Sequence, residues 1–498
     1  MDRFDQLSRD ELLYLVKEER RINEALIEHL HRIGAANELI MQKTLLVGER
    51  YILLKNKLFG KSSERTPQVK DGDNSPSKEK KKRVLLPSER YPDAPLIEQD
   101  VEFKDVPTCS CCGETLTDSG MTENSEFLTI IPKQYFVVRQ QRHKYECRKC
   151  HGDIQTAPLP PRIKEGSAYS DEMTIDVALT KYCDLIPIER YAAMAARGGI
   201  KNLPPQSLIE TSHYLADYVN GAYEKLRGEL LAAGVLHADE TPHRMLEGDK
   251  KNSWFLWGFS SPTTSYFECH STRSGDVASR LLMNAACRYL VSDVYTGYGK
   301  AVKDVNQVRL KEGLPLIEHV YCNAHARRYF RQAGERFPAE AAFFVEQYRE
   351  VYRLEGLSKG QEPSEVTALR EQMRPLFELM KRQAMEVLPG VSDKSLMAKA
   401  ARYFVGNYAG LTRFLDNPEL PIDNNPQERL LRSPVIGRKT WYGTHSKQGA
   451  RTGAILFSLV ESCKLNQINP REYFRDLVVA LHQGLPVFTP AEYKNPKL

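Results

Sequence analysis

The segment from residue 235 to residue 322 limits the possible folds of this chain more than any other. Short runs of apolar and aromatic residues, separated by turn residues, predict three strands at Val235–Asp239, Ser253–Ser260 and Ser265–His270. Because only short turns connect these runs, we expect them to form an antiparallel meander.

Helices and strands alternate after this meander. A helix is expected from about Asp276 to Cys287, a strand at Tyr289–Ser292, a second helix after Gly299, and a strand at His319–Cys322. Three antiparallel strands followed by alternating helix and strand are the layout of a ribonuclease-H-like α/β core. We therefore expect such a core within a multidomain α+β chain.

Three acidic residues occupy selected places in this expected core. Asp239 and Asp293 each follow an apolar, strand-like run, and Glu428 lies in the first turn of a predicted helix. Asn424 or Asn425 can cap that helix, and a proline follows at its first turn. Carboxylates from two strands and a helix can hold two divalent metal ions about 3.5–4 Å apart, as in-line displacement at a phosphodiester requires.

Two neighbouring acids compete with this assignment. Asp423 lies five residues before Glu428 and is an alternative third ligand, although the helical position favours Glu428. Glu240 follows Asp239 directly, so its side chain should point to the opposite face of the strand. We therefore expect Glu240 to be the poorer ligand.

Length and composition define the class of protein. A chain of 498 residues suggests about three or four domains. Charged residues make up 27% and hydrophobic residues 41%, which is typical of a soluble globular protein. The net charge of +5 is weak evidence for a nucleic-acid partner, whereas local clusters of Lys and Arg are stronger evidence. No signal peptide and no apolar run of membrane-spanning length are recognised, so we expect a cytoplasmic protein without a membrane partner.

Four of the ten cysteines form two Cys-x-x-Cys pairs, Cys109 with Cys112 and Cys147 with Cys150. A glycine follows each pair closely, and strand-like residues lie between the pairs. This pattern predicts a tetrahedral zinc site with four cysteine ligands. Cys111 is a spare thiol that can replace Cys109 or Cys112.

The remaining segments complete the domain prediction. Leucines and isoleucines at helical spacing predict a long helix or coiled coil in the first 60 residues. Three short helices between 166 and 220 suit a helix-turn-helix unit, although any small helical bundle gives the same pattern. The expected domains are a helical N-terminal region, a basic linker, a zinc domain, a helical DNA-binding-like domain, the first part of the core, a helical insertion, the last part of the core and a tail: 1–60, 61–99, 100–160, 161–230, 231–329, 330–418, 419–480 and 481–498.

Several blocks of this sequence resemble one family of bacterial transposases. They are His237-Ala-Asp-Glu-Thr-Pro, Val291-Ser-Asp-Val-Tyr-Thr-Gly-Tyr, Cys322-Asn-Ala-His-Ala-Arg-Arg-Tyr-Phe, Pro421-Ile-Asp-Asn-Asn-Pro-Gln-Glu-Arg and Ile436-Gly-Arg-Lys-Thr-Trp. The chain is thereby identified as similar to the TnpC-type DDE transposases of the insertion-sequence family numbered sixty-six. The resemblance covers nearly the whole chain and includes the cysteine pairs.

This resemblance implies a chemistry and a set of site residues. Asp239, Asp293 and Glu428 are then expected to hold two Mg²⁺ (or Mn²⁺) ions for cleavage at transposon ends and 3′-hydroxyl strand transfer into target DNA. Cys322 and His325 match a Cys-x-x-His motif of DDE families, in which His325 contacts the scissile phosphate, while Cys322 is equally well explained as a core residue. The expected DNA contacts are Arg327, Arg328, Arg429, Arg432, Arg438, Lys439 and Trp441, the last of which either stacks on a base or packs in the core.

The same resemblance sets expectations about partners. We expect double-stranded DNA, a homodimer, small accessory proteins of the same element and a nucleoid-associated location. Two other functions remain open at this point. One is a structure-specific nuclease with the same core, and the other is a DNA-binding regulator derived from a transposase.

Overall fold

A computed structural model describes residues 17, 86–92, 94–98, 107–116, 125–130, 133–147, 154–247 and 253–493. The chain divides into two compact units, Ser63–Val138 and a larger unit of Met1–Ser62 with Arg139–Leu498. Apart from Lys17, the predicted N-terminal coiled coil lies outside the described residues. So do the first 25 residues of the predicted linker, and Cys150.

A five-stranded sheet forms the centre of the larger unit, with the strand order β5-β4-β3-β6-β7. The meander is confirmed, because β3 pairs antiparallel with β4, and β4 with β5. Strands β6 and β7 then continue the sheet in parallel with β3. The five strands are Val235–Arg244, Ser253–Ser260, Ser265–His270, Tyr289–Ser292 and Glu318–Tyr321.

The helices between the parallel strands differ slightly from the prediction. Helix α8 spans Asp276–Met283 and ends four residues before Cys287, because the chain turns after Asn284 toward β6. Helix α9 spans Thr296–Lys311, so it begins before Gly299. Both connections return the chain to the same sheet, as parallel strands require.

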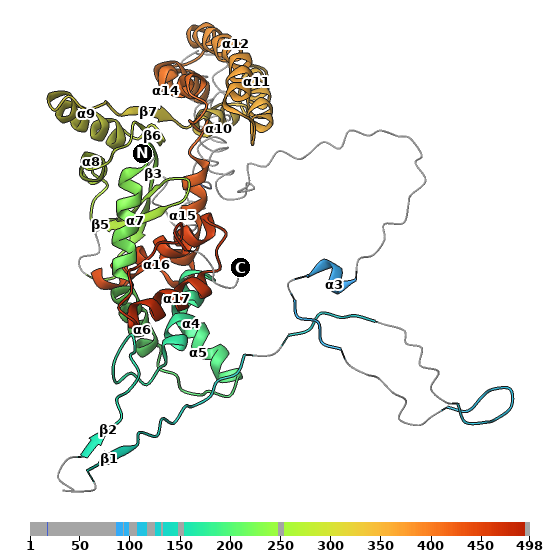
Figure 1. The fold of residues 1–498 in the computed structure, drawn as a ribbon. Coiled ribbons are helices and arrows are strands. Elements are labelled where there is room, and N and C mark those ends of the chain that lie inside the picture. The colour runs from blue at the N-terminus through green and yellow to red at the C-terminus, as the bar shows by residue number, and fades with distance from the viewer. Residues whose placement is uncertain are drawn as a thin grey trace. The chain divides into compact units, whose positions relative to one another are not determined.

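Helices from the C-terminal part of the chain cover strands β3 to β5 (Figure 1). Helix α15 spans Asn425–Trp441, α16 spans Lys447–Leu465 and α17 spans Pro470–His482. Ser458 and Ser462 of α16 accept hydrogen bonds from the backbone of β5, which ties that edge strand to the helix. Trp257 and Phe259 of β4 and Tyr266 and Phe267 of β5 are buried in the same core.

The predicted insertion is helical and has its own apolar core. Helix α10 (Asn323–Ala333) leads from β7 into α11 (Pro338–Leu357), α12 (Pro363–Val387), α13 (Leu396–Gly406) and α14 (Tyr408–Thr412). Phenylalanines from α10 to α13 are fully buried and in ring contact with one another. These helices gather beside β7 and α10 in Figure 1. The short helices η2 (Leu388–Gly390) and η3 (Arg413–Asp416) complete the insertion.

The three helices predicted between residues 166 and 220 are confirmed, and a fourth follows before the sheet. They are α4 (Asp171–Tyr182), α5 (Ile188–Arg197), α6 (Pro205–Tyr218) and α7 (Asn220–Ala232). Ser170 caps α4, since its hydroxyl accepts from the Met173 N–H. Helix α6 begins at Pro205, a residue suited to a first turn.

Short elements make up the rest of the described chain. Helix α3 spans Pro87–Arg90, and strands β1 (Lys144–Glu146) and β2 (Ile154–Thr156) form an antiparallel pair. No helix among the described residues is both long enough and apolar enough to cross a bilayer.

Candidate active site

Asp239 and Asp293 lie at the same level of two neighbouring strands. The prediction that Asp239 ends its strand is wrong, because β3 continues to Arg244. Strand β6, however, pairs with β3 only as far as His237, opposite Val291. Continuing that register by two residues sets Asp239 level with Asp293, the first residue after β6. The sheet opens between the two aspartates because β6 stops there.

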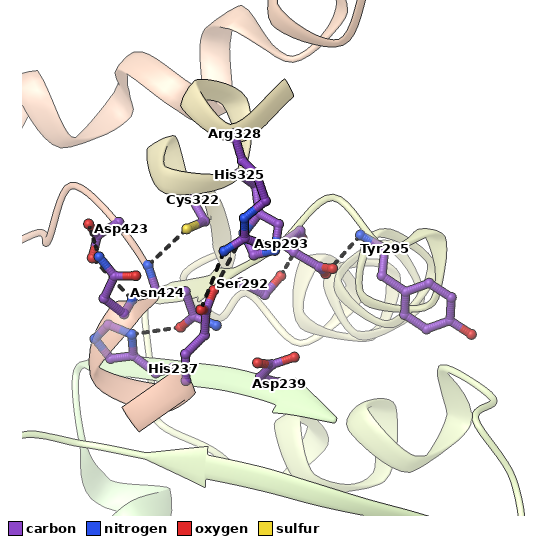
Figure 2. A network of polar contacts seen from close by, with 12 residues as sticks. His237, Asp239, Ser292, Asp293, Tyr295, Cys322, His325, Arg328, Asp423 and Asn424 are labelled. Carbon is purple, nitrogen blue, oxygen red and sulfur yellow. Dashed lines mark hydrogen bonds and ion pairs between the residues drawn. The ribbon is translucent and has the colours of Figure 1, made fainter. Parts of the chain in front are cut away.

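Glu428 approaches these aspartates from helix α15. Its carboxylate lies 3.6 Å from Nδ1 of His325 and 3.8 Å from Nη2 of Arg328, both on α10. Figure 2 shows the polar contacts around this region, with His325 and Arg328 of α10 labelled together with Asp239 and Asp293. Among the described residues, no set of carboxylate oxygens, one each from Asp239, Asp293 and Glu428, lies within 4.8 Å of one another. The ligand atoms of Cys322, His325 and Glu428 do lie that close together. The three acids therefore share one region, with Glu428 turned toward α10.

Negative charge accumulates around Asp239. Burial raises the pKa of the Asp239 carboxyl well above its usual range, and the nearby carboxylates of Glu240, Asp293 and Glu428 raise it further. Glu240 has its own partners, since Arg273 donates to it at 2.6 Å and Tyr298 at 2.5 Å. The carboxylates of Asp293 and Glu428 thus add negative charge beside Asp239, which a divalent metal ion would stabilise.

Asp423 has a different role from the other acids. It is 7% exposed and accepts hydrogen bonds from the Asn425 N–H at 3.0 Å and the Tyr352 hydroxyl at 3.1 Å. Asn424 occupies the N-cap position of α15, as predicted, but its side chain makes no capping hydrogen bond, and the Asp423 carboxylate accepts from the Asn425 N–H instead. Asp423 thus has its oxygens engaged in local structure.

Asn424 connects the start of α15 to β3. Its side-chain amide donates to the Ala238 carbonyl at 2.9 Å, and its Oδ1 lies 2.9 Å from Nδ1 of His237. Burial lowers the pKa of His237. Sequence reasoning missed His237, although its position two residues before Asp239 puts it on the same face of the strand.

Cys322 and His325 lie at the start of α10. The Cys322 side chain is fully buried and accepts a hydrogen bond from the Asn424 N–H at 3.2 Å. Burial raises the pKa of this thiol to about 12, so it is neutral at ordinary pH. His325 instead faces Glu428. The structure therefore makes Cys322 a core residue that supports α15, one of the two interpretations left open by the sequence.

The predicted DNA-binding residues divide into exposed and enclosed ones. Arg429, Arg432 and Lys439 are exposed and spaced by three and seven residues, so they share one face of α15. Arg438 turns inward and donates to the Thr241 hydroxyl at 3.1 Å, and burial lowers its pKa. Trp441 packs edge-on against Tyr182, with ring centroids 6.3 Å apart.

The two predicted DNA-binding arginines on α10 are differently placed. Arg328 forms the ion pair with Glu428 described above. Arg327 lies over the ring of Tyr352, 5.5 Å from its centroid. Both arginines therefore contact the insertion or the acids while remaining partly exposed.

The cysteine segment contains a compact thiol cluster. The sulfur atoms of Cys109, Cys111 and Cys112 lie within 4.8 Å of one another. A tight turn brings them together, in which the Cys109 N–H donates to Glu114 and Gly113 adopts φ +77°. The Cys111 thiol lowers the pKa of Cys109 to about 6 by hydrogen bonding. Cys147 is exposed in the larger unit and Cys150 lies outside the described residues, so a joint four-cysteine site stays a prediction.

Comparison with known proteins extends these observations. Residues 166–452 match the family described as "Transposase IS66 family", and residues 107–151 match "zinc-finger binding domain of transposase IS66". The chain is 28% identical to the uncharacterized protein y4jD of Sinorhizobium fredii (strain NBRC 101917 / NGR234), over 76% of this chain and 75% of y4jD. It is 25% identical to y4hP of the same organism, over 75% of this chain and 70% of y4hP.

Proposed function

This chain belongs to the IS66 transposase family, and we propose that it is a DNA transposase that works by the DDE mechanism. The observation that carries the proposal is the convergence of Asp239, Asp293 and Glu428 from β3, β6 and α15. The sheet order β5-β4-β3-β6-β7, with its antiparallel and parallel parts, supports a ribonuclease-H-like core.

The three carboxylates of Asp239, Asp293 and Glu428, here called the acid edge, fit divalent metal ions of the Mg²⁺ type. The donors are carboxylate oxygens, which Mg²⁺ and Mn²⁺ prefer. Burial, and then the neighbouring carboxylates, raise the pKa of Asp239, and a bound cation would favour its charged form. Two such ions would be held by Asp239, Asp293 and Glu428. When bound, they would supply Lewis-acid stabilisation of the attacking and leaving oxygens.

The protein's own residues then orient the DNA. The exposed face of α15 with Arg429, Arg432 and Lys439 holds the phosphate backbone beside the acids. Water attacks the phosphorus at the transposon end and the 3′ oxygen leaves, which frees a 3′-hydroxyl. That hydroxyl next attacks a target phosphodiester, so one bond forms as another breaks. His325 and Arg328, which hold Glu428 here, donate to the scissile phosphate.

Glu428 rather than Asp423 is the third acid in this proposal. The contacts of Asp423 with Asn425 and Tyr352 support this choice, because both of its oxygens already serve the start of α15. The cysteine segment adds a structural Zn²⁺, which the zinc-finger match supports. We further propose double-stranded DNA and a second copy of the chain as partners, together with small proteins of the same element, at the bacterial nucleoid.

Cleavage of labelled transposon-end DNA tests the proposal. Wild-type protein with Mg²⁺ or Mn²⁺ should leave a 3′-hydroxyl, and Glu428→Ala should lose about 10³-fold or more in rate while still binding the DNA. Glu350→Ala is the matched control, since Glu350 is an exposed helical acid paired with Arg353. Cleavage that survives in Glu428→Ala would remove Glu428 from the site. Specific end binding without any metal-dependent cleavage would indicate a regulator, and cleavage without strand transfer would indicate a nuclease.

A further inference from the structure

Asn424 joins three elements that carry the candidate site. Its side-chain amide donates to Ala238 on β3, its Oδ1 contacts His237 on the same strand, and its backbone N–H donates to Cys322 at the start of α10. The residue is 1% exposed, so water does not compete for these contacts. Figure 2 shows Asn424 between the labelled side chains of His237 and Cys322.

The orientation of this amide is determined by its partners. The Ala238 carbonyl can only accept, so the amide nitrogen of Asn424 must face it. The amide oxygen consequently faces His237, and Nδ1 of His237 must carry the proton that it accepts. Both polar ends of the Asn424 side chain are therefore matched to β3, and no other residue type of this size offers one donor and one acceptor in that arrangement.

The contacts of Asn424 lie immediately beside two of the acids. Ala238 precedes Asp239 in the chain, and the Glu428 N–H donates to the Asn424 carbonyl at 3.1 Å within the first turn of α15. Asn424 thus contacts the residue next to Asp239, and it lies one helical turn, about 5.4 Å, before Glu428. A shift of Asn424 relative to β3 changes the distance between Asp239 and Glu428 directly.

The segment before Asn424 is also held. The backbone N–H and the side-chain amide of Asn323 both donate to the Ile422 carbonyl, at 3.2 and 3.1 Å. Tyr352 donates to Asp423. These contacts fasten the approach to α15 onto the insertion but none of them reaches β3. Within this segment, the side chain of Asn424 makes the hydrogen bonds to the strand of Asp239.

We propose that Asn424 is a positioning residue that fixes the separation of Asp239 and Glu428 and thereby sets the affinity of the acid edge for divalent metal ions. This inference rests on the proposed function. Without the amide, the Ala238 carbonyl and the His237 N–H lose their buried partner, and β3 and α15 separate to let water reach them. Residues that orient metal ligands typically alter metal affinity by about 10–100-fold when replaced.

Binding of Mn²⁺ to the full-length chain without DNA tests this role. The free Mn²⁺ signal in electron paramagnetic resonance gives the dissociation constant for wild type, Asn424→Ala and Asn424→Asp. We expect the constant to rise about tenfold or more in both variants. The aspartate variant is informative because it keeps the size of Asn424 but sets an acceptor against the Ala238 carbonyl.

Asn306→Ala is the matched control. The Asn306 amide also makes two hydrogen bonds, to the carbonyl and the N–H of Ile317 at 2.8 Å each, and it fastens α9 to the segment before β7. Asn306→Ala should lower the melting temperature about as much as Asn424→Ala does. Its dissociation constant for Mn²⁺ should stay within about twofold of the wild-type value. If Asn424→Ala does not fold, His237→Phe removes one of the same hydrogen bonds from the strand side and should also weaken Mn²⁺ binding.

Each outcome decides one of the two claims. The positioning role is overturned if Asn424→Ala binds Mn²⁺ as tightly as the control Asn306→Ala does. The same holds for His237→Phe where it replaces Asn424→Ala. Mn²⁺ binding that persists in the double variant Asp239→Asn, Glu428→Gln overturns the metal site of the proposed function instead. Binding lost in that double variant but unchanged in Asn424→Ala leaves the proposed function intact and removes only the inference about Asn424.

Discussion

The acid edge and the cysteine segment hold candidate metal ligands in opposite ways. Around the acids, Trp257, Phe259 and Leu290 are fully buried, and hydrogen bonds connect β3, α10 and α15. Among the described residues between 107 and 147, none is buried, and Phe136 is 83% exposed. Packing therefore shapes the region around the acids, whereas we expect the cysteine segment to need a zinc ion to define its structure.

Removal of zinc should produce the largest difference in behaviour between the cysteine segment and the acid edge. Structural zinc contributes about 10–16 kcal/mol in small zinc-binding peptides, so a chelator should unfold the cysteine segment. We expect protease cleavage between residues 107 and 151 to accelerate about tenfold or more. The fluorescence of the tryptophans, Trp254, Trp257 and Trp441, should not change, because all three lie on β4 and α15, outside the cysteine segment.

Cysteine variants identify the ligands in the same assay. Cys112→Ser should abolish zinc binding, and Cys183→Ser, a partly exposed cysteine of α4's C-terminal end, should leave it intact. Cys111→Ser distinguishes the spare thiol from a ligand. Zinc retained in Cys112→Ser but lost in Cys111→Ser would show that Cys111 has replaced its neighbour.

Two phenylalanines provide the next contrast. Phe259→Ala on β4 removes a fully buried ring and should cost about 3–5 kcal/mol in the free energy of unfolding, because a cavity remains. Phe136→Ala should change the stability of the zinc-loaded protein by no more than about 0.5 kcal/mol. Urea unfolding followed by tryptophan fluorescence measures the first, and thermal protection from proteolysis the second. A loss above about 2 kcal/mol for Phe136→Ala would mean that zinc buries this ring.

The sequence predicted the strands well because their patterns were unambiguous. The runs at 253–260, 265–270 and 289–292 are apolar and aromatic between turn residues, and each strand has the predicted bounds. The end of β3 was wrong, because residues after Asp239 look polar. They remain in the strand since β4 continues to pair with them as far as Arg244 opposite Ser253.

The candidate site was less predictable than the strands. The acids were found from their positions, but their separations depend on contacts between residues far apart in the chain. Asn424 looked like a helix cap, and nothing local indicates that its amide reaches β3, 186 residues earlier. Similarly, Arg438 and Arg432 look alike in sequence, and only packing on β3 turns Arg438 inward.

Buried histidines predict an acid sensitivity confined to the larger unit. Burial lowers the pKa of His319 to about 3 and that of His243 to about 4, from 6.5. A lowered pKa means that stability is fully present above about pH 6.5 and is lost as the pH falls toward the folded pKa values. Each such histidine should cost about 1.4 kcal/mol per pH unit in this window.

Urea unfolding at pH 7.5, 6.0 and 5.0 measures this loss. His319→Asn should flatten the dependence of stability on pH, although it lowers stability at pH 7.5 through its contact with Ser292. His445→Asn is the control, because His445 is exposed. Equal slopes for wild type and His319→Asn would show that His319 is not kept neutral by burial.

The smallest expected effects separate the basic residues of α15. Arg429→Gln, Arg432→Gln and Lys439→Gln should each reduce the slope of log binding constant against log salt by about 0.9, because each removes one phosphate contact. Arg438→Gln should leave that slope unchanged, since its guanidinium is committed to Thr241. Fluorescence anisotropy with labelled duplex at several salt concentrations measures all four. An equal reduction for Arg438→Gln would mean that Arg438 leaves Thr241 when DNA binds. The packing of α15 against β3 would then be less rigid than the contacts in the structure indicate.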